Sequence, residues 1–395
     1  IIKSFYLKFK LIMKIKYGSQ TINGEDIKRA TKVFGSEYLT QGPEVINFEN
    51  NLKKKFGSKY CSVVSSGTAA LHLAVMSLSL GKNSKIITTP MTFVATSNSI
   101  IMNNLIPEFV DIDINSYTID LNKLEHKLKK DKKIKAAIGI DYAGNICDWE
   151  SLSYLAKKYR IKLINDNCHA IGTRYKGKTN YACKYADIVT QSYHPVKAIT
   201  TAEGGSVLTN NKKIYERVSK LRSHGINRSI QLQKKHGPWY YSIDELGYNY
   251  RLTDIQSALG INQLKKLDKF ISDRRSLAKI YDSEFKNIKE LKIPKSRENC
   301  SHSYHLYPLL IDFKKLKISK KDFFLKMQKI GIFMQVHYLP IHYHKYYRKK
   351  FNFRKGDFPV SEDFYNKEVS LPIYPSLNKK QIFKVIHSIK KILSI

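Results

Sequence analysis

The sequence predicts an α/β protein with a large mixed, mostly parallel sheet domain and a smaller C-terminal α+β domain. Between residues 60 and 209, short segments rich in β-branched residues alternate with segments whose apolar residues recur at helical spacing. This alternation is typical of a parallel sheet covered by helices on both faces. After Thr253 the apolar spacing stays helical over residues 255–280, and a second, shorter set of strand and helix patterns follows.

The expected elements follow one another in a regular order. Strands are predicted over residues 60–65, 85–89, 107–111, 134–141, 161–166, 186–192 and 206–209, and helices over 68–79, 121–130 and 149–159. Pro90 ends one strand, and Gly204-Gly205 turn the chain into the last. The helix over 255–280 should connect to a domain with strands over 304–311 and 333–338, a helix near 320–330 and a final helix from 379. Residues 226–242 are expected to form a polar loop.

These patterns divide the chain into two domains and an extension. Residues 17–270 are expected to form the large domain and residues 271–395 the small one. Residues 1–16 mix lysines with apolar residues and contain no small-residue cleavage site, so they do not resemble a signal peptide. We expect them to be an N-terminal extension, with Met13 a plausible start of translation.

Composition excludes several classes of protein. The net charge is +36, but the lysines are spread along the chain without a stripe of interleaved aromatics, so nucleic acid is not expected as the main partner. An anionic small substrate is compatible with such a charge. No apolar run reaches the length of a membrane helix. Five scattered cysteines without C-x-x-C spacing indicate a reduced, cytoplasmic protein with no metal site.

Lys197 is the strongest candidate for chemistry. It lies between the strands expected at 186–192 and 206–209, after Pro195 and before Gly204-Gly205. A lysine on a rigid loop between buried strands can lose its proton and attack a carbonyl, forming the Schiff base used with pyridoxal phosphate. The alternative is a solvated surface lysine, since the chain contains 69 lysine and arginine residues.

The ends of other strands carry groups that suit the same cofactor. Ser66-Gly67-Thr68 stands between a strand and a helix start, where free N–H groups and the helix dipole favour a phosphate. Phe93 follows another strand and can stack on a flat ring. Taken singly, the first motif is also a routine helix cap, and an aromatic in such a run is more often part of the core.

Asp166 ends the strand 161–166, at the edge of an open α/β sheet where ligands bind. A carboxylate there can face the pyridine nitrogen of pyridoxal phosphate and keep it protonated. His169 follows three residues later and can support Asp166 or contact the cofactor. The structural alternatives are a helix-capping aspartate and a buried histidine. Asn249 and Arg251 precede the long helix without an obvious local partner.

The motifs occur in an order that resembles a known family. They are Ser-Gly-Thr-Ala-Ala (66–70), Pro-x-Thr-Phe-x-Ala-Thr (90–96), Asp-x-x-His-Ala-x-Gly (166–172), Ser-x-His-x-x-Lys-x-x-Thr-x-x-Glu-Gly-Gly (192–205) and Gly-x-Asn-x-Arg (247–251). From about Tyr17 onward the chain resembles the nucleotide-sugar aminotransferases of the DegT/DnrJ/EryC1/StrS type. This resemblance implies the fold-type I, aspartate aminotransferase-like architecture and pyridoxal 5'-phosphate as cofactor.

The resemblance also implies roles for individual residues. The cofactor would be bound by Lys197, Asp166, His169, Gly67, Thr68, Phe93, Ser192 and Asn249. Lys197 would form the Schiff base and move a proton, and Asp166 would hold the pyridinium. Asn249 would reach the phosphate in the neighbouring subunit, which implies a homodimer with shared active sites. The sugar nucleotide would be bound by Tyr17, Glu37, Tyr38, Leu39, Thr40, Gln335, Val336, His337 and Tyr338.

Further segments resemble the branch of the family that serves pseudaminic acid biosynthesis, among them residues 38–42, 141–144, 222–225 and 335–338. This implies transfer of an amino group from L-glutamate to C4 of a UDP-linked 4-keto-6-deoxy-N-acetylhexosamine. The alternatives are another nucleotide-linked keto sugar, such as a GDP-4-keto or 3-keto sugar, and a non-catalytic homologue. Lys197 disfavours the sugar dehydratases of this fold, some of which have histidine at that position.

Overall fold

The computed structural model describes residues 14–395. Most of the expected N-terminal extension, residues 1–13, therefore lies outside the described residues. Ile15, which also belongs to that extension, is fully buried. Its N–H donates to the carbonyl of Gly331 and its carbonyl accepts from the N–H of Phe333, both at 2.8 Å. The chain from Lys14 onward is thus joined to the C-terminal part of the fold.

A seven-stranded sheet forms the centre of the molecule, with strand order β1-β8-β7-β5-β4-β2-β3. Its strands are β1 (Tyr60–Val64), β2 (Lys85–Thr88), β3 (Ile106–Phe109), β4 (Ile134–Ile140), β5 (Lys162–Asp166), β7 (Ile188–Ser192) and β8 (Gly205–Thr209). β8 is antiparallel to both its neighbours, and the other pairs are parallel. The predicted mixed, mostly parallel α/β sheet is therefore confirmed.

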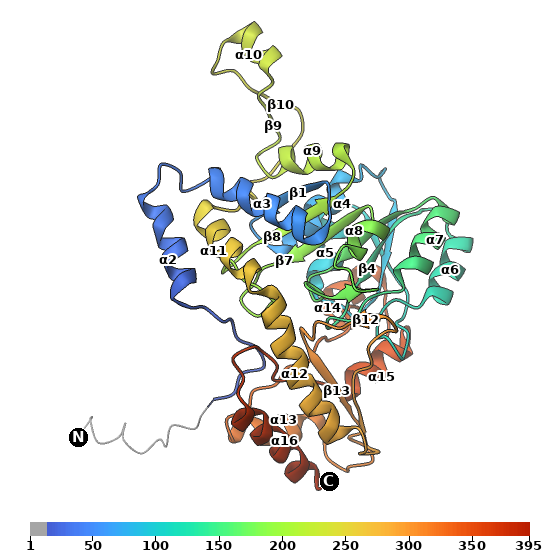
Figure 1. Ribbon diagram of the computed structural model, residues 1–395. Coiled ribbons are helices and arrows are strands. Elements are labelled where there is room, and N and C mark those ends of the chain that lie inside the picture. Colours follow the sequence, from blue (N-terminus) through green and yellow to red (C-terminus); the bar gives the residue numbers. More distant parts are fainter. Residues whose placement is uncertain (1–13) are drawn as a thin grey trace, which may run out of the picture.

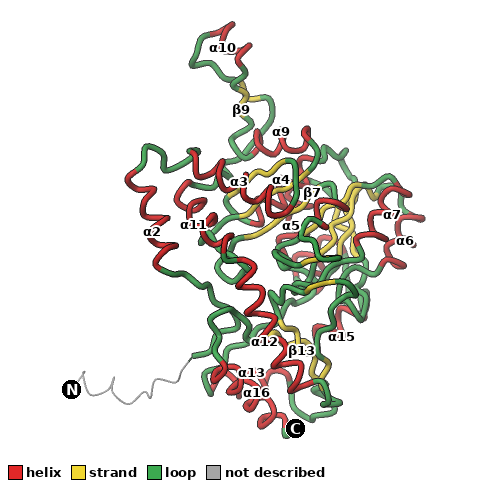
Figure 2. The backbone as a smooth tube through the Cα atoms, in the orientation of Figure 1, coloured by secondary structure: helices red, strands yellow, loops and turns green. Residues whose placement is uncertain are grey.

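Helices surround this sheet (Figure 2). They are α3 (Pro43–Phe56), α4 (Gly67–Ser77), α5 (Val94–Met102), α6 (Leu121–Lys130), α7 (Trp149–Tyr159), α8 (Tyr181–Tyr185) and α9 (Lys212–Leu221), whereas α2 (Gly24–Lys32) packs farther out, against the helix over 254–265. α4 is apolar on all sides and almost wholly buried, because it packs against β7, β8 and α5. α6 is amphipathic, with Leu124 and Leu128 buried and its lysines outside.

The helical structure predicted over 255–280 is confirmed at every residue except Lys266, which separates two helices. α11 (Asp254–Lys265) ends at Lys266, and α12 (Leu267–Phe285) runs on into the C-terminal part of the molecule (Figure 1). Neither proline nor glycine marks the break. The amine of Lys266 binds the carboxylate of Asp26, and α11 packs against α2 and α3. Tertiary contacts with the N-terminal helices thus hold α11 and the residue at its C-terminal end.

The C-terminal part contains a three-stranded antiparallel sheet of β11 (Leu291–Lys292), β13 (Tyr307–Ile311) and β14 (Glu368–Leu371), in the order β11-β13-β14. Its helices are α13 (Lys320–Lys329), α14 (Lys345–Phe351), α15 (Pro359–Lys367) and α16 (Lys379–Leu393). The strand predicted over 333–338 is wrong. Gln335 pairs with Ser370 of β14 at one isolated bridge, and the next N–H in register, that of His337, turns to the carboxylate of Glu368.

The polar loop predicted over 226–242 is wrong as well, since the segment contains ordered elements. β9 (Ile226–Asn227) and β10 (Ser242–Ile243) pair antiparallel, with α10 (Ile230–His236) between them. We call residues 226–246 the arm. It extends away from the body of the molecule (Figure 1). Its exposed apolar side chains are Ile230, Trp239, Tyr241, Ile243 and Leu246.

Candidate active site

A cavity of about 500 Å³ lies at the carboxyl ends of the parallel strands. Most of the predicted site residues line it, namely Tyr17, Gly67, Thr68, Phe93, Asp166, His169, Ser192, Lys197, Gln335, Val336, His337 and Tyr338. The large sheet provides one wall of the cavity, and the segment 335–338 from the C-terminal part provides another. The site thus joins residues that are far apart in the sequence.

The start of α4 forms an anion-binding cup. Ser66 caps the helix by accepting a hydrogen bond from the N–H of Ala69 at 3.1 Å. The N–H groups of Gly67 and Thr68, in the first turn, have no intrahelical acceptor and lie at the positive end of the helix dipole. A Cβ on Gly67 would come within 2.7 Å of the Cβ of Ser192. Glycine therefore allows the close approach of α4 to β7, and the cup fits a phosphate.

Lys197 lies on the loop that follows β7, as the sequence predicts. Its backbone N–H donates to the carbonyl of His194 at 2.9 Å. The buried Tyr193 anchors the same loop, with its hydroxyl 3.0 Å from Oε1 of Gln191 and 2.6 Å from Oγ of Ser206. Burial lowers the pKa of the Lys197 amine, against the opposing effects of Cys168 and Asp166. A larger fraction of this amine is therefore unprotonated and nucleophilic than in a surface lysine.

Asp166 is buried at the end of β5 with both carboxylate oxygens held. The hydroxyl of Thr96 donates to Oδ2 at 2.8 Å, and the N–H of Cys168 donates to Oδ1 at 3.2 Å. Thr96 in turn lies 2.9 Å from the hydroxyl of Thr92. These donors fix the carboxylate at the cavity wall. A fixed negative charge in such a place fits the protonated ring nitrogen of pyridoxal phosphate.

A buried carboxylate beneath this wall holds the loop around Asp166. Asp141 accepts hydrogen bonds from the N–H of Cys147, the indole of Trp149, the amides of Asn165 and Asn167, and the hydroxyl of Tyr181, all at 2.8–3.0 Å. Burial still raises the pKa of Asp141 to about 6, in spite of these donors. Since Asn165 and Asn167 flank Asp166, the network sets the position of the cavity carboxylate.

His169 is a neutral imidazole in this site. Burial lowers its pKa well below the usual value, and the charge of Lys197 acts in the same direction. The N–H of Ala143 donates to Nδ1 at 3.4 Å, so Nε2 carries the hydrogen and faces the hydroxyl of Tyr338 at 3.0 Å. The ring of Phe93, 53% exposed, lies 5.7 Å from the ring of Tyr338 between their centres. Both rings border the space next to Asp166.

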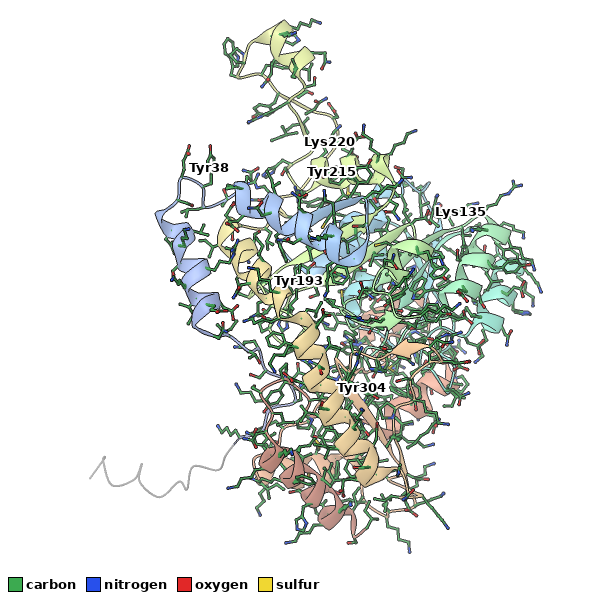
Figure 3. All side chains as sticks on the ribbon, viewed as in Figure 1. Tyr38, Lys135, Tyr193, Tyr215, Lys220 and Tyr304 are labelled. Carbon is green, nitrogen blue, oxygen red and sulfur yellow. The ribbon has the colours of Figure 1, made fainter. Side chains whose placement is uncertain are left out.

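The remaining predicted residues do not line this cavity. Residues 37–40 are exposed between α2 and α3, where the carbonyl of Leu39 accepts from the N–H of Asp254 at 3.0 Å. Tyr38 lies at the outer edge of the molecule (Figure 3). Asn249 is exposed, and its backbone pairs with Ser223 beside the base of the arm. The chain therefore brings together the residues predicted to bind the cofactor, except Asn249, and only part of the predicted sugar pocket.

Sequence reasoning missed several residues that line the cavity, and three of them lie beside Asp166 or His169. Thr96 follows Phe93 by one helical turn in a motif that the sequence displays, so its spacing could have indicated it. Cys168 stands between Asp166 and His169 and lines the cavity. His305 also lines the cavity and is buried, with its Nδ1 unpaired among the described residues. No local pattern distinguishes His305, because only the fold brings it beside His169, at 4.4 Å between ring centres.

Comparison with known proteins decides the family. The model of the DegT/DnrJ/EryC1/StrS aminotransferase family matches residues 20–390. This chain belongs to that family. It is similar to the UDP-4-amino-4,6-dideoxy-N-acetyl-beta-L-altrosamine transaminase of Campylobacter jejuni, with 39% identity over 387 residues, 95% of this chain and 99% of the relative.

Solved structures agree with this assignment. The structure of Helicobacter pylori PseC, an aminotransferase of pseudaminic acid biosynthesis, has a TM-score of 0.89 at 33% identity, over 96% of this chain and 99% of that one. A putative sugar aminotransferase of Streptococcus pneumoniae, solved in its pyridoxal phosphate form, has a TM-score of 0.87 at 26% identity, with 96% and 99% covered. This chain is therefore a sugar aminotransferase with the fold-type I architecture, and it depends on pyridoxal 5'-phosphate.

Two further features of the described residues complete the comparison with the sequence. Within residues 14–395, no group of three or more histidine, cysteine, aspartate or glutamate side chains is arranged to hold a metal ion. In the same part of the chain, no helix combines the length and the apolar character that a membrane crossing requires.

Proposed function

We propose that this aminotransferase transfers an amino group from L-glutamate to C4 of a UDP-linked 4-keto-6-deoxy-N-acetylhexosamine, in pseudaminic acid biosynthesis. The near full-length similarity to the Campylobacter transaminase carries this proposal. The cavity supports it, because Lys197 and Asp166 face a wall made by residues 335–338, the segment that sequence reasoning assigned to the sugar.

The residues of the cavity divide the work between binding and proton transfer. Pyridoxal phosphate, when bound, supplies a ring that accepts electrons from the carbon that loses its proton. The cup of Gly67, Thr68 and Ser192 would hold the phosphate, and the carboxylate of Asp166 would keep the ring nitrogen protonated. The amine of Lys197 would attach the cofactor, and the same amine, when free, would move a proton at Nζ to and from the substrate carbon. Glutamate and the sugar use this one site in turn, which predicts ping-pong kinetics.

The substrate can be tested directly. Purified protein is incubated with glutamate and, in parallel, with the UDP-4-keto sugar, a GDP-4-keto sugar and a 3-keto sugar, and the products are identified by NMR. We expect kcat/KM for the UDP-4-keto sugar to exceed the others by at least about 100-fold, since several contacts discriminate between them. Preference for one of the other sugars would support the alternative substrate. A protein that neither binds the cofactor nor turns over any sugar would be a non-catalytic homologue.

We also propose a homodimer in which Asn249 and residues 37–40 of one protomer complete the cavity of its partner. These residues are exposed and do not line the cavity of their own chain. The arm, next to Asn249, exposes Trp239 at 78% and Leu246 at 74% of their surfaces. Exposed apolar side chains grouped on one projecting element are typical of a protein–protein interface.

Mixed dimers test whether the sites are shared. Lys197→Ala and Asn249→Ala chains are co-expressed with different tags, and dimers carrying both tags are assayed at limiting cofactor. If Asn249 acts in the partner's site, each mixed dimer has one intact site, and we expect about half of the wild-type activity. If Asn249 acts within its own chain, no site is intact and activity stays at the level of the single variants. Doubly tagged Lys197→Ala dimers are the control and should be inactive.

A further inference from the structure

A hydrogen-bonded chain of three side chains runs from the cavity into the C-terminal sheet. The residue His337 lines the cavity, and its Nδ1 lies 2.8 Å from Oγ of Ser370. Oγ of Ser370 donates to Oε1 of Glu368 at 2.5 Å, and the backbone N–H of His337 donates to Oε2 of the same carboxylate at 3.0 Å. Ser370 and Glu368 are fully buried in β14. We call these three residues the relay.

The directions of these hydrogen bonds determine where the hydrogen of His337 lies. Burial, together with the charge of Lys197, lowers the pKa of His337 to about 3, so the ring is neutral and carries one hydrogen. Ser370 donates its only hydrogen to Glu368, so its oxygen accepts from Nδ1–H of His337. Nε2 therefore carries a lone pair. No described residue bonds to Nε2, and the protein does not fully enclose this atom.

We propose that Glu368 and Ser370 set the tautomer of His337 so that Nε2 accepts a hydrogen bond from an O–H or N–H group of the keto sugar. This inference rests on the proposed function, because it assigns a sugar contact in the same cavity. Ring hydroxyls and an acetamido N–H are donors, whereas the carboxylates of glutamate are acceptors only and its one donor, the amino group, is the group that reacts at the cofactor. His337 is thus assigned to the sugar half of the reaction, and Glu368 and Ser370 are positioning residues for it.

Protonation of Glu368 reverses the relay. Oε2 already accepts from the backbone N–H of His337, so the proton goes to Oε1 and is donated to Oγ of Ser370. The hydroxyl of Ser370 then donates to Nδ1 of His337, and the ring hydrogen moves to Nε2. Nε2 of His337 then offers a hydrogen-bond donor to the cavity, where before it offered an acceptor. The sugar half-reaction should therefore have a higher kcat/KM when Glu368 is ionised than when Glu368 is protonated.

The groups around Glu368 place this change near neutral pH. Burial raises the pKa of Glu368 to about 7, against the hydrogen bonds of Ser370 and His337 and the charge of Lys320 on α13. Burial lowers the pKa of Lys320 to about 8, and its Nζ donates to the carbonyl of Tyr365 at 2.5 Å. The hydroxyls of Tyr142 and Tyr338 are close enough to interact electrostatically with this carboxylate, and they stay neutral because burial raises their pKa values. The acceptor form thus dominates above about pH 7 and is lost as pH falls through that value.

Glu368→Gln should lock the relay in the reversed direction. The amide oxygen takes the place of Oε2 at the N–H of His337, so the NH₂ group donates to Ser370. We expect kcat/KM for the sugar half-reaction to fall about 10- to 100-fold and to lose its pH inflection near neutrality, since a cavity acceptor becomes a donor. The rate of the glutamate half-reaction, followed by the absorbance of the bound cofactor, should stay within about twofold of the wild type. Glutamate does not depend on a hydrogen bond to Nε2 of His337.

Two more variants separate the relay from a general structural role. Ser370→Ala cuts the relay and should remove the pH inflection of the sugar half-reaction. Lys320→Met removes the positive charge that lowers the pKa of Glu368, so the inflection should move to higher pH while the limiting rates stay the same. The matched controls Glu284→Gln and Ser283→Ala, on α12 with partly exposed or exposed side chains, should leave both half-reactions unchanged.

NMR of ¹⁵N-histidine-labelled holoenzyme tests the relay without any sugar. His337 is assigned by difference from His337→Gln. We expect the hydrogen on Nδ1 in the wild type at about pH 8, and on Nε2 in Glu368→Gln and in the wild type at about pH 6. One tautomer in all three samples would overturn the proposal, and so would an equal loss of both half-reactions in Glu368→Gln. If the UDP sugar is not a substrate, the proposed function fails, but the tautomer and the glutamate half-reaction still decide the relay.

Discussion

Lys197→Ala should lower turnover by at least about 10⁴-fold, because the same amine attaches the cofactor and moves the proton. The loop around Lys197 is held by backbone bonds and by the buried Tyr193, so removal of the side chain should leave the fold intact. The visible absorption of lysine-bound cofactor should be lost. After borohydride reduction, mass spectrometry should find the cofactor on Lys197 in the wild type and on no peptide of the variant.

Chemical rescue separates the two roles of this lysine. An added small amine such as methylamine should restore part of the turnover of Lys197→Ala, because it replaces the missing proton carrier in the cavity. Lys213→Ala, an exposed lysine at the start of α9, is the matched control and should behave as the wild type. Full activity and full cofactor absorbance in Lys197→Ala would contradict the assignment of Lys197.

Asp166→Asn should lower kcat by about 10³-fold, the second largest effect that we expect. The amide keeps the size of the side chain and an acceptor for the hydroxyl of Thr96, but it removes the negative charge that stabilises the protonated ring nitrogen. Steady-state kinetics of both half-reactions measure the loss, which should be similar in both, since both depend on the protonated ring. A circular dichroism melt checks that the fold is retained.

Two further variants limit the interpretation of Asp166→Asn. Thr96→Val removes one donor to the carboxylate but keeps the charge, so its loss should be smaller, about tenfold. Asp363→Asn changes an exposed carboxylate paired with Lys367 and should have no effect. A loss in Asp166→Asn no greater than that in Asp363→Asn would show that the negative charge at the cavity wall is dispensable.

Much of the fold could be predicted because its signals are local. The central strands and α6 and α7 were found within about two residues, since apolar periodicity and turn residues reflect the burial of single elements. The positions of Lys197 and Asp166 followed in the same way, because each lies at the end of such a strand. The family resemblance added Ser192 and the segment 335–338, all of which line the cavity.

Failed predictions concern segments whose structure depends on distant partners. The interruption at Lys266, which no local pattern indicates, lies where its amine binds the carboxylate of Asp26, 240 residues away in the chain. The segment 333–338 is not a strand, because the N–H of His337 binds the side chain of Glu368. The arm was predicted as a loop because many of its side chains are exposed. Periodic apolar patterns arise where one face of a helix or strand is buried, and the arm has no such face.

The sequence by itself thus determined the sheet and the residues that can carry aminotransferase chemistry, because both depend on short-range patterns. Only the tertiary structure decided how these residues meet. The parallel strands place Asp166 and Lys197 at one edge, and β14 places Ser370 and Glu368 behind His337. The direction of that relay depends on the burial of a carboxylate by residues from several segments, which no local pattern in the chain encodes.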